Sequence, residues 1–262
     1  MKLERSDGVG ILTIDTPRNN AVNPDFIREC HELLDQVEAD DAIRALVVTS
    51  SHRSLFSPGA DLPFLIPLAP HDIRAYFEGV TSLVRRKFGF PKPKVCALNG
   101  HAVAAGCFMA LTGDYRIMVR GRYYIGLMEI DLGLPTFAGV VAMMNHVLGG
   151  RISERVLYAG ENFLPDQALE LGLVDELVER DGLMQRALDR ARLLGSKPAG
   201  AYETLKRYSR QAVVERMRQL DATSVDDILT SWFTPDTQRL LQAAVERLAK
   251  KGDRRDVGKG SV

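Results

Sequence analysis

Two short runs of mostly apolar residues constrain the fold of this chain more than any other feature of its sequence. Residues 45–50 (ALVVTS) and 94–98 (KVCAL) have the nearly continuous apolar character of strands that are buried on both faces. Residues 9–15 are rich in β-branched side chains and predict a further strand that ends before Pro17. Helical patterns alternate with these strands, so the sequence predicts an α/β fold.

The remaining elements follow from apolar spacing and from the positions of proline and glycine. Asn23 and Pro24 predict the start of a helix whose apolar stripe runs from Phe26 to Val37. Two short strands are expected at 115–119 and 123–125, joined by a turn at Gly121, and a last strand at 174–178. From about Gly182 onward only helices are predicted. The other helical segments are 73–87, 104–111, 136–148, 153–159, 165–171, 183–194, 199–209, 213–229 and 235–251.

The charge balance and the cysteines exclude several classes of protein. The 262 residues contain 34 Lys and Arg and 34 Asp and Glu, so no global basic field favours nucleic acid as a partner. No apolar run reaches the roughly 20 residues of a membrane span, and the first residues lack the apolar core of a signal peptide. We therefore expect a cytoplasmic protein. Cys30, Cys96 and Cys107 lack metal-ligand spacing and are expected to be buried thiols, so no metal is predicted.

Two loops that contain glycine each follow a predicted strand. They are FSPGADL at residues 56–62 and NGHAVAAGC at residues 99–107. Small residues allow backbone N–H groups to come close to a ligand, and two such donors form an oxyanion hole. A glycine after a strand is, however, more often a simple turn.

Glu129 is the candidate for a general base. It lies just after a predicted short strand among apolar neighbours, which could raise the pKa of its carboxyl group by excluding water. Taken alone, the position of Glu129 in the sequence fits a solvated carboxylate in a turn at least as well as it fits a buried base.

The order and spacing of FSPGADL, NGHAVAAGC and MEIDLGL (residues 128–134) resemble those of the crotonase, or enoyl-CoA hydratase/isomerase, superfamily. The resemblance extends from the opening strand and PRNNAVN at 17–23 to ALELGLV at 168–174. It implies a spiral of ββα turns over residues 1–195 and a C-terminal helical region over 196–262 for capping and oligomerisation. It also implies an acyl-CoA thioester as substrate, coenzyme A as the only cofactor-like group, and assembly as a homotrimer or hexamer.

The family's site residues can be placed on this sequence motif by motif. The resemblance implies that the backbone N–H groups of Ala60 and Ala105 are the oxyanion donors, with Gly59 and Gly106 beside them. Phe108 is expected to belong to the substrate site together with these two glycines. Any residue except proline can donate a backbone N–H, so alanine at position 105 does not remove the function. Arg18 stands near the position where relatives bind the CoA phosphates or adenine.

A departure from the family pattern indicates the subclass. Hydratases of this family use two glutamates, and the first of these positions is occupied here by Phe108, so that only Glu129 remains. Hydration needs a positioned water molecule, whereas one carboxylate is enough to move a proton from C2 to C4 of a 3-enoyl-CoA. The chain therefore resembles the Δ3,Δ2-enoyl-CoA isomerases most. A hydratase, a hydrolase and an inactive acyl-CoA-binding scaffold remain alternatives.

Other polar residues near the motifs are given secondary roles. Asp131 is the alternative base, because on an extended segment it would share a face with Glu129. Asp61 and Asp114 are expected to be structural, and His101 to be a packed loop residue.

Overall fold

The computed structural model describes the backbone of residues 1–257 and the side chains of residues 1–248. Its larger sheet has six strands in the order β1-β2-β3-β5-β7-β10, in which only β1 runs antiparallel to its neighbour. The strands are β1 (Lys2–Ser6), β2 (Val9–Ile14), β3 (Ala45–Ser50), β5 (Lys94–Leu98), β7 (Tyr115–Val119) and β10 (Glu176–Val178). Every residue of β3 and β5 is buried, as the two apolar runs predict.

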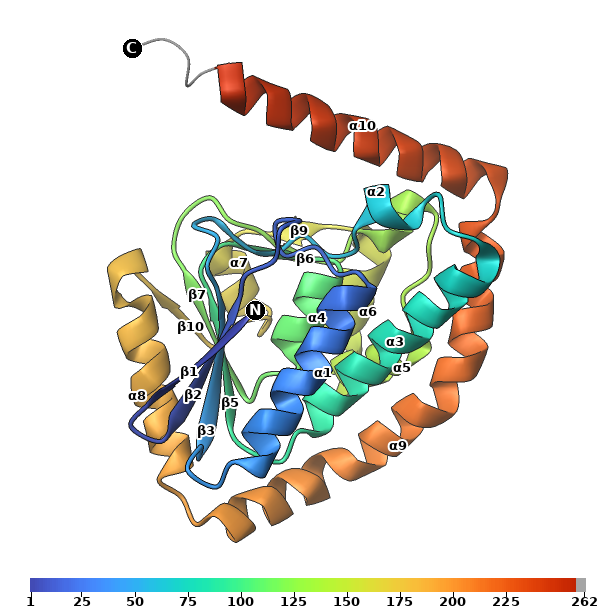
Figure 1. Ribbon diagram of the computed structural model, residues 1–262. Helices are drawn as coiled ribbons and strands as arrows, with labels where there is room; N and C mark the ends of the chain where they lie inside the picture. Colours follow the sequence, from blue (N-terminus) through green and yellow to red (C-terminus); the bar gives the residue numbers. More distant parts are fainter. Residues whose placement is uncertain (258–262) are drawn as a thin grey trace.

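A second, smaller sheet explains the spiral. Its order is β4-β6-β8-β9, with β4 (Leu55–Ser57), β6 (His101–Val103), β8 (Ile125–Gly126) and β9 (Asn162–Phe163). Along the chain, β3, β5 and β7 each lie in the large sheet and are each followed by a strand of the small sheet. Helical segments then lead into the next turn, so the ββα spiral is confirmed (Figure 1).

The helices pack against the sheets, and the first of them begins where its capping residues predict. Asn23 Oδ1 accepts a hydrogen bond from the backbone N–H of Phe26 at 2.9 Å, and Pro24 occupies the first turn of α1. The helices up to residue 195 are α1 (Pro24–Ala39), α2 (Leu62–Leu65), α3 (Pro70–Gly89), α4 (Ala105–Leu111), α5 (Ala138–Leu148), α6 (Gly150–Ala159), α7 (Pro165–Glu170) and α8 (Leu183–Gly195), with short 3-10 turns η1 (Glu129–Leu132) and η2 (Arg180–Gly182).

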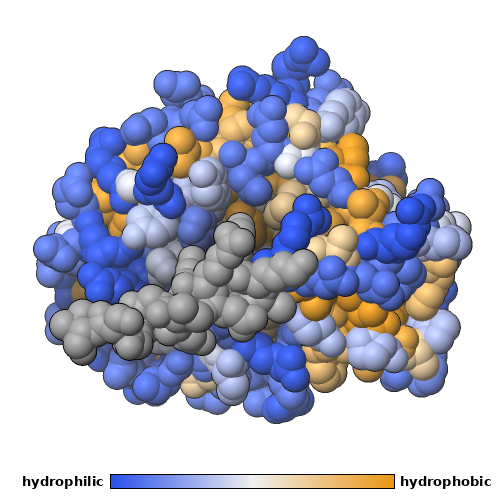
Figure 2. All heavy atoms as spheres, turned by 90° about the horizontal axis from the view of Figure 1, so that it is seen from above, coloured by the Kyte–Doolittle hydropathy of each residue, from blue (hydrophilic) through white to orange (hydrophobic). Residues whose placement is uncertain are grey.

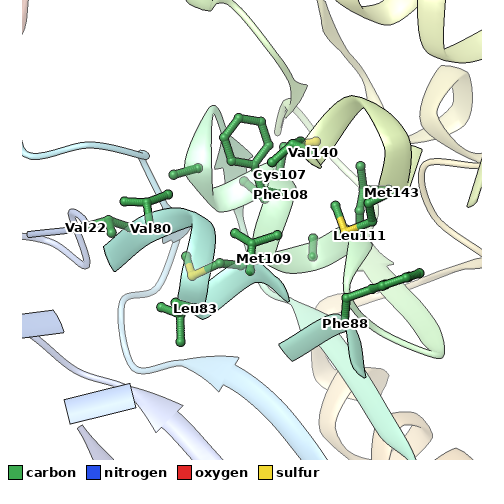
Figure 3. Packing of buried hydrophobic residues seen from close by; sticks show 14 of the residues in the cluster. Val22, Val80, Leu83, Phe88, Cys107, Phe108, Met109, Leu111, Val140 and Met143 are labelled. Carbon is green, nitrogen blue, oxygen red and sulfur yellow. The ribbon is translucent and has the colours of Figure 1, made fainter. Parts of the chain in front are cut away.

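Two hydrophobic cores lie on the two faces of the large sheet. The larger one contains the apolar stripe of α1 together with α3, α4 and α5, and residues of α4 and α5 surround Phe108 within it (Figure 3). The smaller one lies between the sheet and α8, where Ala187 and Ala191 contact strand residues such as Val47 and Ile117. Burial on both faces explains why these strands lack an alternating polar pattern.

Two long helices complete the described chain. Helix α9 (Ala199–Trp232) has 34 residues and packs along α3 and α5, whereas α10 (Pro235–Val257) contacts η1 and α2 (Figure 1). The ion pairs of Asp114, whose side chain is 9% exposed, with Lys206 at 2.7 Å and with Arg210 at 2.9 Å tie α9 to the core. The division of the chain at residue 195 into core and cap stays a prediction, and residues 258–262 lie outside the described part.

One strand was missed, and two expectations about individual elements were wrong. Strand β1 was not predicted because it is a polar, largely exposed edge strand, joined to β2 by a turn at Asp7 and Gly8. Segments 199–209 and 213–229 form one helix, because Ser209–Ala212 interrupts the apolar spacing but contains neither proline nor glycine. The strands on either side of Gly121 do not pair, since β7 and β8 belong to different sheets.

Candidate functional site

The two loops predicted to carry the oxyanion donors lie against each other. Strands β4 and β6 pair in parallel, with Ser57 opposite Ala102, so the loops that follow them leave from the same edge of the small sheet. A Cβ atom added to Gly59 would lie 2.7 Å from Ala104 Cβ and 3.2 Å from the backbone nitrogen of Ala105. A Cβ added to Gly106 would collide with the carbonyl oxygen of Ser57. The two glycines therefore permit an approach that larger residues would prevent.

The predicted donors are not used by secondary structure. A bridge to Val22 uses the backbone on either side of Ala60, because Val22 N–H donates to Gly59 O at 2.7 Å and Asp61 N–H donates to Val22 O at 3.0 Å. Among the described residues, neither the N–H of Ala60 nor that of Ala105 donates a hydrogen bond. Both donors are available to a ligand, and their convergence on one oxygen atom stays a prediction.

The backbone is strained next to the second donor. Ala104 precedes the first residue of α4 with φ of 51° and ψ of −126°, a conformation that non-glycine residues rarely adopt. The hydrogen bond from its N–H to Gly126 O, at 2.9 Å, holds it against the strand that leads to Glu129. Strain that surrounding contacts maintain in this way is typical of functional sites.

The same pairing places Glu129 beside the loops. Strand β8 pairs with β6 through Ala102 opposite Ile125 and Val103 opposite Gly126, and Glu129 follows three residues later as the first residue of η1. Its Oε2 atom is buried and has no hydrogen-bond partner among the described residues. Exclusion of water raises the pKa of its carboxyl group from 4.5 to about 7, although the backbone amides of Met128 and Glu129 offset part of this effect. The solvated turn carboxylate is thus excluded.

The neighbours of Glu129 are apolar or uncharged. Burial raises the pKa of the Tyr76 hydroxyl and of the Cys107 thiol, and the nearby charge of Glu129 raises both further. The Cys107 thiol therefore stays protonated, which argues against a thiolate nucleophile. Tyr76 is buried and donates its hydroxyl to Val22 O at 3.1 Å.

Phe108 points into a hydrophobic environment and contributes no polar atom. It is buried within α4, in the core cluster that also contains Val80 of α3 and Val140 of α5 (Figure 3). Its ring lies 6.5 Å from that of Phe137, which in turn lies 5.7 Å from Phe77. A phenyl ring at this position adds to an apolar wall and cannot position water.

The acidic and basic residues around the loop that contains Ala60 bind one another. The buried Asp61 is 3.3 Å from Arg18 Nε and accepts a hydrogen bond from Asn23 Nδ2 at 3.3 Å. The half-exposed Arg18 also lies over the ring of Phe64. The structural role expected for Asp61 fits these contacts, and Arg18 lies next to the loop of Ala60 through Asp61. Its contact with CoA stays a prediction.

Three other candidates lie outside the site. Asp131 does not share a face with Glu129, because the segment is a 3-10 helix rather than an extended strand, and its carboxylate is exposed. Asp114 forms the ion pairs that hold α9. Nδ1 of His101 accepts a hydrogen bond from Tyr124 N–H at 3.0 Å, and its ring stacks on Tyr124, in keeping with a packed loop residue.

The segment between residues 62 and 93 adds a groove beside the site. The groove has a volume of about 510 Å³, runs between α1, α2 and α3, and is lined mainly by apolar residues such as Phe64 and Leu68. Tyr76 forms part of its wall, which places the groove next to the chain that bridges to Ala60. Sequence spacing gave no signal for Tyr76.

Within the described part of the chain, no three His, Cys, Asp or Glu side chains are grouped so as to hold a metal ion, and no helix is long and apolar enough to cross a bilayer.

Known proteins resemble this chain over most of its length. The model of the family described as enoyl-CoA hydratase/isomerase matches residues 4–251. Human mitochondrial enoyl-CoA delta isomerase 1 is 30% identical over 245 residues, which cover 93% of this chain and 81% of that protein. The short-chain-enoyl-CoA hydratase of Clostridium acetobutylicum is 27% identical over 78% of each chain. The crystal structure of human mitochondrial delta3-delta2-enoyl-CoA isomerase superposes with a TM-score of 0.91 at 29% identity and covers 95% of this chain and 98% of that one.

Proposed function

Because the chain belongs to the enoyl-CoA hydratase/isomerase family and has the crotonase fold, we propose that it is a Δ3,Δ2-enoyl-CoA isomerase acting on an acyl-CoA thioester. One observation carries this choice within the family. Glu129 is a single carboxyl group with a buried Oε2 atom and a raised pKa, and the position of the other glutamate of hydratases is occupied by the buried Phe108. Relatives that carry the name isomerase agree with it.

The proposed reaction uses two features of the site. The N–H groups of Ala60 and Ala105 hold the thioester oxygen and stabilise the negative charge that develops on it when a proton leaves C2. Glu129 removes this proton and returns it to C4, so that the double bond moves from the 3,4 to the 2,3 position. With a pKa near 7, the same carboxyl group is a usable base when ionised and a usable acid after it has taken the proton.

The apolar surroundings favour proton transfer over addition of water. Phe77, Phe108 and Phe137 form a connected aromatic group beside the site, and none of them can orient a water molecule. A hydratase remains the second candidate, because the relative from Clostridium acetobutylicum has that name. An inactive acyl-CoA-binding scaffold is disfavoured. The Glu129 carboxylate, whose buried Oε2 atom has no partner among the described residues, costs stability, and an inactive scaffold would have no use for such a group.

The binding properties proposed with this function follow from the family. The protein takes an acyl-CoA thioester, requires no cofactor apart from the CoA carried by the substrate, and assembles as a homotrimer or hexamer. Gly59 and Gly106 admit the thioester between the two loops, and Arg18 contacts the CoA moiety. The cytoplasmic location is proposed from the sequence alone.

A panel of substrates tests the proposal. A 3-enoyl-CoA, a 2-enoyl-CoA and a saturated acyl-CoA are offered to the protein, and isomerisation, hydration and thioester hydrolysis are followed side by side. We expect isomerisation of the 3-enoyl-CoA to exceed the other two activities. Faster hydration of the 2-enoyl-CoA would replace the proposed isomerase function by that of a hydratase. Binding without turnover of any thioester would favour an inactive acyl-CoA-binding scaffold.

A further inference from the structure

Helix α10 contacts the turn that carries Glu129 through one buried hydroxyl group. Thr237, of which 3% is exposed, donates a hydrogen bond from Oγ1 to the carbonyl oxygen of Gly133 at 3.3 Å. We propose that Thr237 is a positioning residue, which holds the η1 turn so that the Glu129 carboxyl group stays in place beside the oxyanion loops. This inference rests on the proposed role of Glu129 as the base.

The geometry of η1 connects the carbonyl of Gly133 to Glu129. Glu129 is the first residue of the turn, and Gly133 is the residue that ends it. Gly133 N–H donates to Ile130 O at 3.0 Å, and Leu134 N–H donates to Glu129 O at 3.0 Å. These bonds close the turn into a small unit, so a shift of the Gly133 peptide is transmitted to the backbone of Glu129.

The close approach of α10 also explains the glycine at position 133. Gly133 has a φ of +75°, in the left-handed region, and a Cβ atom added to it would lie 2.6 Å from Thr237 Oγ1. A larger residue would therefore be strained and would push the hydroxyl group away. Glycine and threonine at these two positions fit each other, although they are 104 residues apart in the chain.

Thr237 is itself held firmly. Its backbone N–H donates to Thr234 Oγ1 at 3.2 Å, and Thr234 Oγ1 donates to Ser231 O at 3.0 Å, which fixes the junction between α9 and α10. Leu241, one helical turn further on, is fully buried in the main core. Helix α10 also contacts α2, the helix that follows Ala60, so it bridges the segments of the base and of one oxyanion donor (Figure 1).

Seen from above, the molecule shows mostly hydrophilic side chains with hydrophobic ones in several separate places (Figure 2). The titratable groups that respond to the charge of Glu129 are Tyr76 of α3 and Cys107 of α4, and burial keeps both protonated at neutral pH. A change in the titration of Glu129 in a Thr237 variant therefore reports on the turn and its access to water.

Three variants test the proposal by steady-state kinetics with a 3-enoyl-CoA. Thr237→Val keeps the shape but removes the hydroxyl, and Thr237→Ser keeps the hydroxyl. Thr230→Val is the matched control, because Thr230 is an exposed α9 residue whose hydroxyl bonds only Asp226 O of its own helix. We expect Thr237→Val to lower kcat about tenfold with KM within about twofold, since a catalytic group misplaced by about 1 Å can cost up to about a hundredfold. Thr237→Ser and Thr230→Val should stay close to the wild type.

Infrared titration of the Glu129 carboxyl band gives a readout that does not depend on turnover. The band is identified by its absence in Glu129→Gln. We expect its apparent pKa to fall from about 7 toward 4.5 in Thr237→Val, because a loosened turn admits water. Unchanged kcat and titration in Thr237→Val overturn the proposal, even if its melting temperature falls. Lack of turnover by the wild type would count against the proposed function alone, since the titration still tests the positioning of the carboxyl group.

Discussion

Replacing Glu129 by Gln should make the protein more stable at alkaline pH, even though it removes the proposed base. The pKa of this carboxyl group is raised from 4.5 to about 7 in the folded protein. In the unfolded chain the group ionises near 4.5, whereas in the folded state it keeps its proton until about pH 7. The wild type therefore loses stability as the pH rises from 4.5 to 7, and the loss stays constant above that range.

The magnitude follows from the same values. The difference between 4.5 and about 7, at about 1.4 kcal/mol for each pH unit, gives an upper limit of about 3.5 kcal/mol. The residue as a whole is only partly buried, and contact with water reduces the effect. We expect Glu129→Gln to gain about 1 to 3 kcal/mol over the wild type at pH 8 and little at pH 4, where the wild-type group is uncharged in both states.

Urea denaturation between pH 4 and pH 8.5, at one protein concentration, measures this difference. Asp131→Asn is the matched control, since the Asp131 carboxylate lies on the same turn but is exposed. The free energy of unfolding of Asp131→Asn should differ from that of the wild type by a similar amount at each pH. A constant difference between Glu129→Gln and the wild type across this range, or a more stable wild type at pH 8, would refute the assignment of a buried, destabilised carboxylate.

Four further predictions concern activity. The pH profile of kcat/KM should show an acidic limb near pH 7, the pKa of Glu129, with activity rising as the carboxyl group ionises. Gly106→Ala should reduce kcat/KM by about tenfold or more, because the added Cβ meets Ser57 O and pushes the two loops apart, and a normal value would argue against the close approach of the loops. Phe108→Glu should add measurable hydration of a 2-enoyl-CoA if the wild type lacks this activity because it lacks a second carboxylate. Asp131→Asn should change the rate of isomerisation less than about threefold. If a folded Phe108→Glu protein shows no hydratase activity, the missing second carboxylate does not explain the lack of hydration.

The elements that the sequence predicts well are those whose pattern has a local cause. Continuous burial of β3 and β5 produces continuous apolar runs, and the Asn23 cap with Pro24 marks the start of α1. The edge strand β1 has no such pattern, because most of its residues are exposed and polar side chains are tolerated there. Helix α9 was divided in two because the polar Ser209–Ala212 segment hides a continuous backbone helix.

The site itself depends on contacts between distant segments. Resemblance to the family picked out Ala60, Ala105 and Glu129, and the pairing of β4, β6 and β8 brings their segments to one edge of the small sheet. Spacing alone could not reveal the strained backbone at Ala104, because a positive φ at alanine contradicts its local preference. The contact of Thr237 with the Glu129 turn joins residues too far apart in the chain for any local pattern to reveal it.

The most direct test of the central claim is the isomerisation rate of Glu129→Gln with a saturating 3-enoyl-CoA, measured beside the binding of a saturated acyl-CoA by calorimetry. The amide keeps the shape of the side chain but cannot accept the C2 proton. Because one group would perform both proton transfers in the proposed mechanism, we expect kcat to fall toward the upper end of about 10² to 10⁴, while the dissociation constant changes less than about threefold. Near-normal isomerisation by Glu129→Gln would contradict the account and make the buried carboxyl group structural.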